Sequence, residues 1–324
     1  THAGLQHFQD IWAKFFRTNV EIISCAQDIE ETLILVVEKA INLAREQKKL
    51  WALYRPIQWY LYGAEHYPEL GFSTAYAQIL ETMPIPGNPK GEAVRMEDPD
   101  SGPLNHSLEL PLLIQALKKD QSQEFEHLQE KAAVALSIAY GRNPANLTYL
   151  RHSDLVNLTP ESDDPVYVLR VPRIKKRLVN PRDDYIEEFL DPAFAKYIHD
   201  LIKANNQINT VLYHEGKKLP NPQPIFLNAK GNEAAILSGD YENAYNFSSS
   251  MITSLIKEFV KRHNIISPVT KELMNVSARR LRYTLATGLA AEGISKAALA
   301  RILDHTDTQH VHVYFELAGK IVIQ

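Results

Sequence analysis

A segment rich in proline and glycine, Met83–Leu104, divides the chain. It contains five prolines, at positions 84, 86, 89, 99 and 103, and three glycines, at positions 87, 91 and 102. Proline lacks the amide hydrogen that helices and central strands use, and glycine adds conformational freedom, so a regular element cannot run through the segment. We predict a linker at 83–104 between two domains, a smaller one at 1–82 and a larger one at 105–324.

Hydrophobic periodicity predicts helices on both sides of this segment. Before it, helical patterns cover Ile29–Gln47, 50–62 and 74–82. We assign the aromatic residues of 50–62 to packing between helices rather than to stacking on bases. After it, helical patterns cover 108–119, 123–140, 249–263 and most of the chain from 279 onward. The alternating Val166–Val179 predicts a β-hairpin, with 224–227 as a possible third strand. The expected fold class is therefore mainly α (α+β), with a small antiparallel β-sheet in the larger domain.

The larger domain places reactive side chains at the ends of short helices. Gly141 ends one predicted helix and Asn143-Pro144 begins the next, so Arg142 lies at a tight corner. Later, the chain contains Arg279-Arg280-Leu281-Arg282-Tyr283-Thr284 at the start of a helix, then Leu303-Asp304-His305, then Tyr314. Cations, a histidine and a tyrosine thus follow one another on successive short helices.

In this order and spacing, the chain resembles the tyrosine recombinases, the phage-integrase family. The resemblance rests on Arg282-Tyr283-Thr284, on Leu303-Asp304-His305, on Tyr314 nine residues beyond the histidine, and on Arg142 in a Gly-Arg corner. It covers roughly Leu104–Phe315. It implies a site-specific recombinase or integrase that cleaves and rejoins DNA through a 3′-phosphotyrosyl intermediate. It also implies that 1–82 is a core-binding domain that clamps DNA, and that 105–324 is a catalytic domain of the tyrosine-recombinase fold.

The resemblance implies six catalytic residues: Arg142, Lys175, Arg279, Arg282, His305 and Tyr314. Arginine forks can stabilise the charge of a phosphodiester transition state, a tyrosine hydroxyl can form a covalent intermediate, and a lysine can protonate the leaving oxygen. Lys175 and Lys176 both lie near the turn of the predicted hairpin, on opposite faces. We prefer Lys175 because it shares a face with Arg173 and Arg177.

Two positions depart from the pattern of the family. Arg279 stands where the family usually has histidine, and a guanidinium cannot serve as a general base. Ala145 stands where an acid often follows the first arginine by three residues. A DNA-binding, recombinase-like protein with impaired cleavage therefore stays open as an alternative, as does a type IB topoisomerase-like protein that relaxes DNA.

The predicted hairpin concentrates positive charge. Between Val166 and Arg182 the sequence has six basic residues and no acidic one. We expect the hairpin to bind DNA phosphates through Arg170, Arg173, Lys176 and Arg177. The whole chain has 35 basic and 39 acidic residues, and the acidity lies in residues 1–100, which hold 9 basic and 14 acidic ones. The negative net charge therefore does not exclude a nucleic-acid partner.

We expect neither a cofactor nor a metal. The single cysteine, Cys25, excludes an intramolecular disulfide and is interpreted as a buried structural thiol. We do not assign a metal site to His305, His310 and His312. The expected partners are double-stranded DNA and further copies of the chain, as a homotetramer on paired DNA sites or as a monomer alone. Because the chain lacks a long apolar stretch and a signal-peptide pattern, we expect a cytoplasmic protein with no membrane contact.

Overall fold

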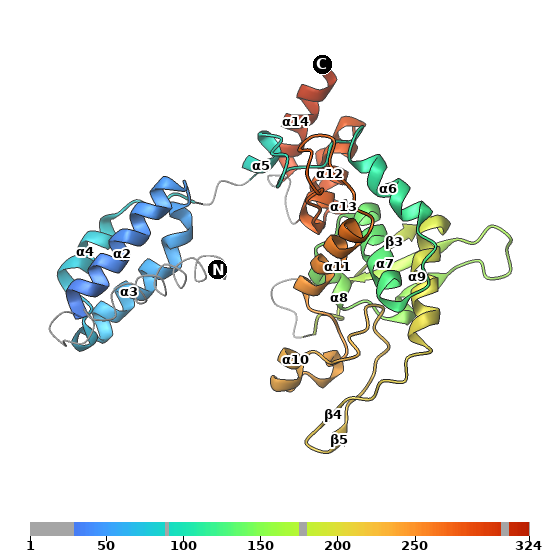
Figure 1. Ribbon diagram of the computed structural model, residues 1–324, viewed down its shortest axis with the longest axis horizontal. Coiled ribbons are helices and arrows are strands. Elements are labelled where there is room, and N and C mark those ends of the chain that lie inside the picture. Colours follow the sequence, from blue (N-terminus) through green and yellow to red (C-terminus); the bar gives the residue numbers. More distant parts are fainter. Residues whose placement is uncertain (1–28, 88–90, 175–179, 306–310, 324) are drawn as a thin grey trace. The chain divides into compact units, whose positions relative to one another are not determined.

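A computed structural model describes residues 29–87, 91–174, 180–305 and 311–323 (Figure 1). Several residues singled out in the sequence lie outside the described residues: Cys25, Lys175, Lys176, Arg177 and His310. None of the described helices is both long enough and apolar enough to cross a membrane.

The chain divides into two compact units, with the boundary between residues 90 and 91. The predicted linker extended to Leu104, whereas the structure assigns its second half to the larger unit. A single helical turn, α5 (Glu92–Arg95), fits between the prolines, and Val94 is fully buried there. Leu104 is buried as well, because its apolar side chain joins the core of the same unit.

Over residues 29–87, the first unit contains three helices: α2 (Ile29–Glu46), α3 (Tyr54–His66) and α4 (Thr74–Thr82), with 3-10 turns η3 (Leu50–Leu53) and η4 (Pro68–Leu70) between them. The apolar face of α2 forms the core with α3 and α4, as its periodicity predicts. Ser73 begins α4 because its hydroxyl accepts a hydrogen bond from the Tyr76 amide, 3.4 Å away.

The aromatic residues of α3 divide between core and surface. Tyr60 is buried, and its hydroxyl accepts from the Ser73 amide at 3.1 Å. Trp59, 45% exposed, lies edge-on to Phe72 with ring centroids 5.1 Å apart. Tyr54 and Tyr62 are 52% and 55% exposed, so the expectation that they pack between helices is wrong for these two residues. They occupy the face of α3 opposite the one that packs, which helical periodicity places in solvent.

The second unit is also mainly helical. Its helices, besides α5, are α6 (Leu110–Lys119), α7 (Phe125–Tyr140), α8 (Pro144–Thr148), α9 (Pro192–Asn205), α10 (Glu233–Leu237), α11 (Ser249–Arg262), α12 (Ala278–Ala291), α13 (Lys296–Ile302) and α14 (His312–Ile323), with 3-10 turns η5 (His152–Asp154) and η6 (Tyr241–Asn243). The central α7 is buried along most of its length and packs against α9, α11 and α12. The sequence analysis missed α9, although Asp191-Pro192 is a typical N-cap and first helical position.

The second unit also contains a three-stranded antiparallel sheet. It consists of β1 (Leu155–Asn157), β2 (Tyr167–Pro172) and β3 (Tyr185–Leu190), in the order β1-β2-β3. A second hairpin pairs the two-residue strands β4 (Tyr213–His214) and β5 (Lys217–Lys218). The prediction of a mainly helical chain with a small antiparallel sheet is confirmed.

Two details of the predicted sheet are wrong. The second strand of the hairpin is 185–190 and lies outside Val166–Val179, so a longer connection joins the strands than expected. Among the described residues, 224–227 forms only isolated bridges, to Arg151 and Asn246, and β1 is the third strand instead.

One end of the second unit gathers α12, α14 and α5, next to the C-terminus in Figure 1. These helices share an apolar cluster that includes Val94, Leu299, Val311 and Tyr314. The β4–β5 hairpin and α10 lie at the opposite end of this unit (Figure 1). The helices that carry or adjoin the predicted catalytic residues therefore pack against α12.

Candidate functional site

The corner between α7 and α8 lies directly against α12. Gly141 ends α7 with a φ of +54°, a conformation that glycine adopts without strain, and its amide donates to the Ser137 carbonyl at 3.1 Å. A Cβ at position 141 would lie 3.0 Å from the Cα of Arg282. Position 141 thus requires glycine, both for the turn and for the close approach of α12. The corner also places Arg142 beside Arg282.

Arg142 is buried at this corner, with 3% of its side chain exposed. Its Nη2 donates to the Glu188 carboxylate on β3. Its Nε is also buried, and no acceptor for it is found in the described part of the chain. A buried guanidinium with an unused N–H favours an external acceptor, such as a phosphate oxygen.

Sequence reasoning missed Glu188. The residue lies 46 positions after Arg142, and only the pairing of β2 with β3 brings it to the corner. The one signal in the sequence was the acidic run of β3, which follows the basic hairpin.

Arg282, on α12, connects three parts of the site. Its Nη1 donates to the Gly141 carbonyl at 2.9 Å, and its Nη2 donates to the Leu303 carbonyl at 2.6 Å and to Nε2 of His305 at 2.8 Å. Burial lowers the pKa of Arg282, and the nearby positive charge of Arg142 acts in the same direction. The predicted grouping of Arg142, Arg282 and His305 is thus present in the structure.

The turn after α13 places His305. The amides of Asp304 and His305 donate to the carbonyls of Arg301 and Ala300, at 3.0 and 2.8 Å. This is the Schellman pattern, which requires a left-handed residue, and Asp304 supplies it with a φ of +55°. Since arginine has only donors, Nε2 of His305 must accept from Arg282, which makes the ring neutral with its proton on Nδ1.

Arg173, at the end of β2, contacts this turn. Its Nε and Nη2 donate to one oxygen of Asp304, at 3.0 and 2.7 Å, and its Nη1 donates to Asp184 at 3.0 Å. The sequence analysis assigned Arg173 to DNA phosphates. In the structure it pairs with two carboxylates, one of them next to His305, and its contact with DNA phosphates stays a prediction.

Tyr314, near the start of α14, is 4% exposed. Burial raises the pKa of its hydroxyl to about 12, and the opposing effects of Arg282 and Arg279 are smaller. Its ring lies 6.1 Å from that of Tyr283, centroid to centroid. Arg279 itself is exposed on the first turn of α12. The site thus combines a buried tyrosine with the cations that act on its hydroxyl.

Much of the positive charge of the hairpin is matched by acids. Arg170 lies opposite Glu187 in the register of β2 and β3, with Nε 3.6 Å from the carboxylate. Arg182 pairs with Asp154 at 2.7 Å. The absence of acids between 166 and 182 therefore does not leave these cations unopposed, because β3 and η5 supply the carboxylates.

Within the described ranges, no group of three or more His, Cys, Asp and Glu residues is arranged to hold a metal ion. The polar centre described above instead combines arginine donors, their carboxylate and histidine acceptors, and the hydroxyl of Tyr314. Such a set can stabilise an anion and supply a nucleophile.

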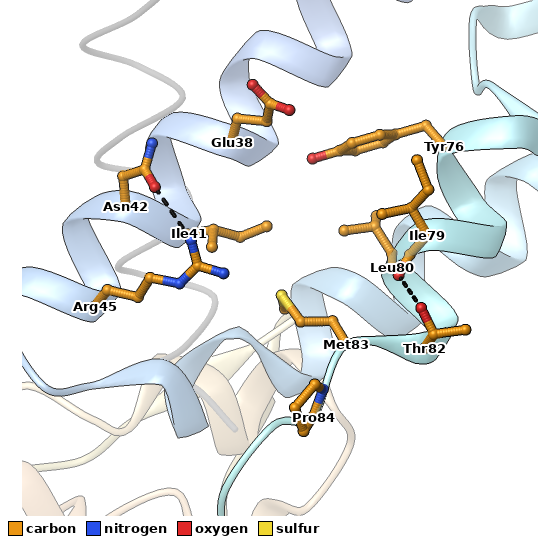
Figure 2. Close-up of a pocket in the computed structure, with 10 residues that line it drawn as sticks. All are labelled: Glu38, Ile41, Asn42, Arg45, Tyr76, Ile79, Leu80, Thr82, Met83 and Pro84. Carbon is orange, nitrogen blue, oxygen red and sulfur yellow. Dashed lines mark hydrogen bonds between the residues drawn. The ribbon is translucent and has the colours of Figure 1, made fainter.

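The first unit contains a separate cavity of about 520 Å³ between α2 and α4 (Figure 2). Glu38 and Arg45 line it from α2 and Tyr76 from α4, and Arg45 donates to Asn42 at 3.5 Å. None of the residues predicted to be catalytic or to bind phosphate contributes to its lining.

No family model matches the sequence, and no curated protein matches it either. Several solved structures are similar to the chain. One is XerA recombinase, with 16% identity, 100% of this chain and 92% of that chain covered, and a TM-score of 0.46. Another is XerH site-specific recombinase bound to difH substrate, with 11% identity, 91% and 84% covered, and a TM-score of 0.47. A third is the Tn1549 transposon integrase in complex with circular intermediate DNA, with 17% identity, 94% and 86% covered, and a TM-score of 0.42.

Proposed function

We propose that the chain is a tyrosine recombinase that cleaves and rejoins DNA through a 3′-phosphotyrosyl intermediate. The observation that carries the proposal is the set of contacts of Arg282. Its guanidinium bonds the carbonyl of the Arg142 corner and Nε2 of His305 at 2.9 and 2.8 Å. It also acts electrostatically on the hydroxyl of Tyr314. Arg142, Arg282, His305 and Tyr314 thus come from four separate stretches of the chain, and Arg282 links them.

This centre suits attack on a phosphodiester. The Oη of Tyr314 bonds to phosphorus, the bond from phosphorus to the 5′-oxygen breaks, and the tyrosine proton passes to solvent. Arg142 and Arg282 hold the non-bridging oxygens, whose negative charge grows in the transition state. With Nε2 of His305 accepting from Arg282, the N–H of this ring is on Nδ1. Lys175 remains our choice for protonating the 5′-oxygen, and Arg279 adds positive charge beside the tyrosine.

The buried hydroxyl of Tyr314 fits a resting state that changes when DNA binds. A tyrosine with a pKa of about 12 is almost entirely protonated at neutral pH and is a weak nucleophile. A phosphate brought against Arg142 and Arg282 supplies the reaction partner, and movement of α14 would align the hydroxyl with it. The same proposal gives the first unit a core-binding role on DNA. It also includes a homotetramer on paired DNA sites and a monomer in the absence of DNA.

A nicked duplex that traps the intermediate tests the proposal. The duplex carries the end sequence of the mobile element that flanks the gene, and the nick lets the released 5′-hydroxyl strand diffuse away. Wild type is expected to form a covalent adduct that survives denaturation, whereas Tyr314→Phe and Arg282→Gln are not. Equal absence of an adduct from wild type and Tyr314→Phe would refute cleavage.

A DNA-binding protein with impaired cleavage is the second candidate. It is favoured by the burial of Tyr314 and by the pairing of Arg142 with Glu188. It predicts salt-sensitive DNA binding of equal affinity in wild type and Tyr314→Phe, with no adduct. Relaxation of a supercoiled plasmid without recombinant product would instead indicate a topoisomerase-like activity.

A further inference from the structure

We infer that Glu188 is a positioning residue, which fixes the guanidinium of Arg142 in the orientation that receives the phosphate. This inference rests on the proposed function. The carboxylate of Glu188 accepts from Nη2 of Arg142, and the two side chains are 24% and 3% exposed. The pair is therefore largely shielded from water, where a charge-assisted hydrogen bond is stronger than at the surface.

The guanidinium needs such a partner because the corner offers little else. Arg142 follows the left-handed Gly141, and four rotatable bonds separate its charge from the backbone. Position 145, one helical turn later, is alanine and offers no carboxylate. Without Glu188, the nearly buried charge of Arg142 would lack its ion-pair partner. This loss would destabilise the folded protein and leave the orientation of the guanidinium unspecified.

The position of Glu188 is itself fixed. It lies on β3 opposite Leu169, and the next residue, Phe189, accepts a hydrogen bond from the hydroxyl of Tyr140 through its carbonyl, at 3.0 Å. Tyr140 is the last residue of α7, two positions before Arg142. The end of α7 and the strand that carries Glu188 are thus joined by two contacts, one between side chains and one to the backbone.

The pairing assigns different tasks to two nitrogens of the guanidinium. Glu188 occupies Nη2, while the buried Nε–H has no acceptor among the described residues. A phosphate oxygen can therefore bind at Nε without displacing the carboxylate. Because the guanidinium is planar and rigid, fixing Nη2 also fixes the direction of the Nε–H.

The neighbouring acid on the same strand provides a matched control. Glu187 points to the opposite face of the sheet, as strand alternation requires, and it pairs with Arg170, whose side chain is 45% exposed. Glu187→Gln removes the same charge from the same strand without touching Arg142. Glu188→Gln keeps the size of the side chain and removes the charge that holds the guanidinium.

The first readout is independent of catalysis. The NMR resonance of the Arg142 Nε–H is assigned in the full chain as the resonance that disappears in Arg142→Lys. We expect Glu188→Gln to shift and broaden this resonance and Glu187→Gln to leave it unchanged. An unchanged resonance in Glu188→Gln, or equal changes in both variants, overturns the inference.

The second readout is the single-turnover rate of adduct formation on the nicked duplex. We expect Glu188→Gln to slow it by about tenfold, the effect of replacing a charge-assisted hydrogen bond with a neutral one, with duplex affinity changed by less than about twofold. The double variant Arg142→Lys with Glu188→Gln is expected to be no slower than Arg142→Lys. Additive losses contradict the inference, because Glu188 would then act independently of Arg142. If wild type forms no adduct, the proposed function fails, while the resonance still decides the role of Glu188.

Discussion

The guanidinium of Arg282 donates to Nε2 of His305 across 2.8 Å, which joins the second arginine of the site to its histidine. Arginine cannot accept a hydrogen bond, so this contact also sets the tautomer of the histidine. The same Nη2 donates to the carbonyl of Leu303, two residues before the histidine. Arg282 therefore organises the turn as well as contributing positive charge.

The acceptor at position 305 can be tested by two substitutions. His305→Gln keeps an oxygen that can accept from Arg282, whereas His305→Leu leaves that N–H without its partner. We expect the adduct to form about tenfold more slowly in His305→Gln and about hundredfold more slowly in His305→Leu, since an unsatisfied buried donor costs about 1–3 kcal/mol. Single-turnover cleavage of the nicked duplex measures both rates. Equal rates for the two variants would show that a hydrogen-bond acceptor at position 305 does not determine the rate of adduct formation.

The close approach of Gly141 to α12 predicts a destabilising substitution. Gly141→Ala introduces a Cβ 3.0 Å from the Cα of Arg282, at a φ of +54°. We expect a loss of about 1–2 kcal/mol from the left-handed backbone alone, with a further loss from the contact. Thermal unfolding measures the loss. Gly293→Ala is the control, because it also has a positive φ, of +85°, but no neighbour within 4 Å of the added Cβ. Equal losses in the two variants would contradict the close contact.

The pairing of Arg173 with Asp304 predicts coupled effects. Arg173→Gln and Asp304→Asn each remove the charge pair that connects β2 to the histidine turn. We expect each to slow adduct formation, and the double variant to lose less than the two single losses combined, with a coupling of about 1 kcal/mol. Lys261→Gln, whose partner is the exposed Glu258, serves as the control and should change the rate by less than about twofold. Strictly additive losses would show that the pair does not act through the turn.

The ion cluster at the end of α11 predicts a response to acid. Asp120 accepts from Arg262 and His263, at 2.6 and 3.0 Å. Burial alone would raise the pKa of Asp120, but these hydrogen bonds outweigh it and lower the pKa to about 2. An aspartate in an unfolded chain has a pKa of about 3.9. The stability that Asp120 contributes is therefore present above about pH 4 and is lost as the pH falls towards 2.

Urea unfolding between pH 5 and pH 2.5 checks this expectation. Wild type should lose stability over that range more steeply than Asp120→Asn, which has no carboxylate to protonate at this position. Asp163→Asn, a change at an exposed loop position, should follow wild type. Parallel curves for wild type and Asp120→Asn would exclude Asp120 as the origin of the acid sensitivity.

The helices near the site could be predicted from local signals. The N-cap serines of α12 and α13 and the glycine that ends α7 mark their helix ends in the sequence. These signals alone did not group Arg142, Arg282, His305 and Tyr314, because that grouping came from the resemblance to the tyrosine recombinases. The location of Lys175 and its neighbours stays a prediction.

The partners of the cations could not be predicted, because they depend on contacts between distant parts of the chain. Glu188 reaches Arg142 through the register of β2 and β3, and Asp304 reaches Arg173 across 131 positions. A count of charges along the sequence cannot reveal such pairs. The exposed aromatic face of α3 was misassigned for a related reason, because composition does not show which face of a helix the core covers.

The location of the covalent bond tests the central claim most directly. Wild-type protein is trapped on the nicked duplex, digested with nuclease and protease, and its peptides are analysed by mass spectrometry. The account predicts a nucleotide attached through a 3′-phosphate to Tyr314, and no adduct in Tyr314→Phe. A nucleotide on Tyr283, whose ring lies 6.1 Å from that of Tyr314, or an undiminished adduct in Tyr314→Phe, would contradict it.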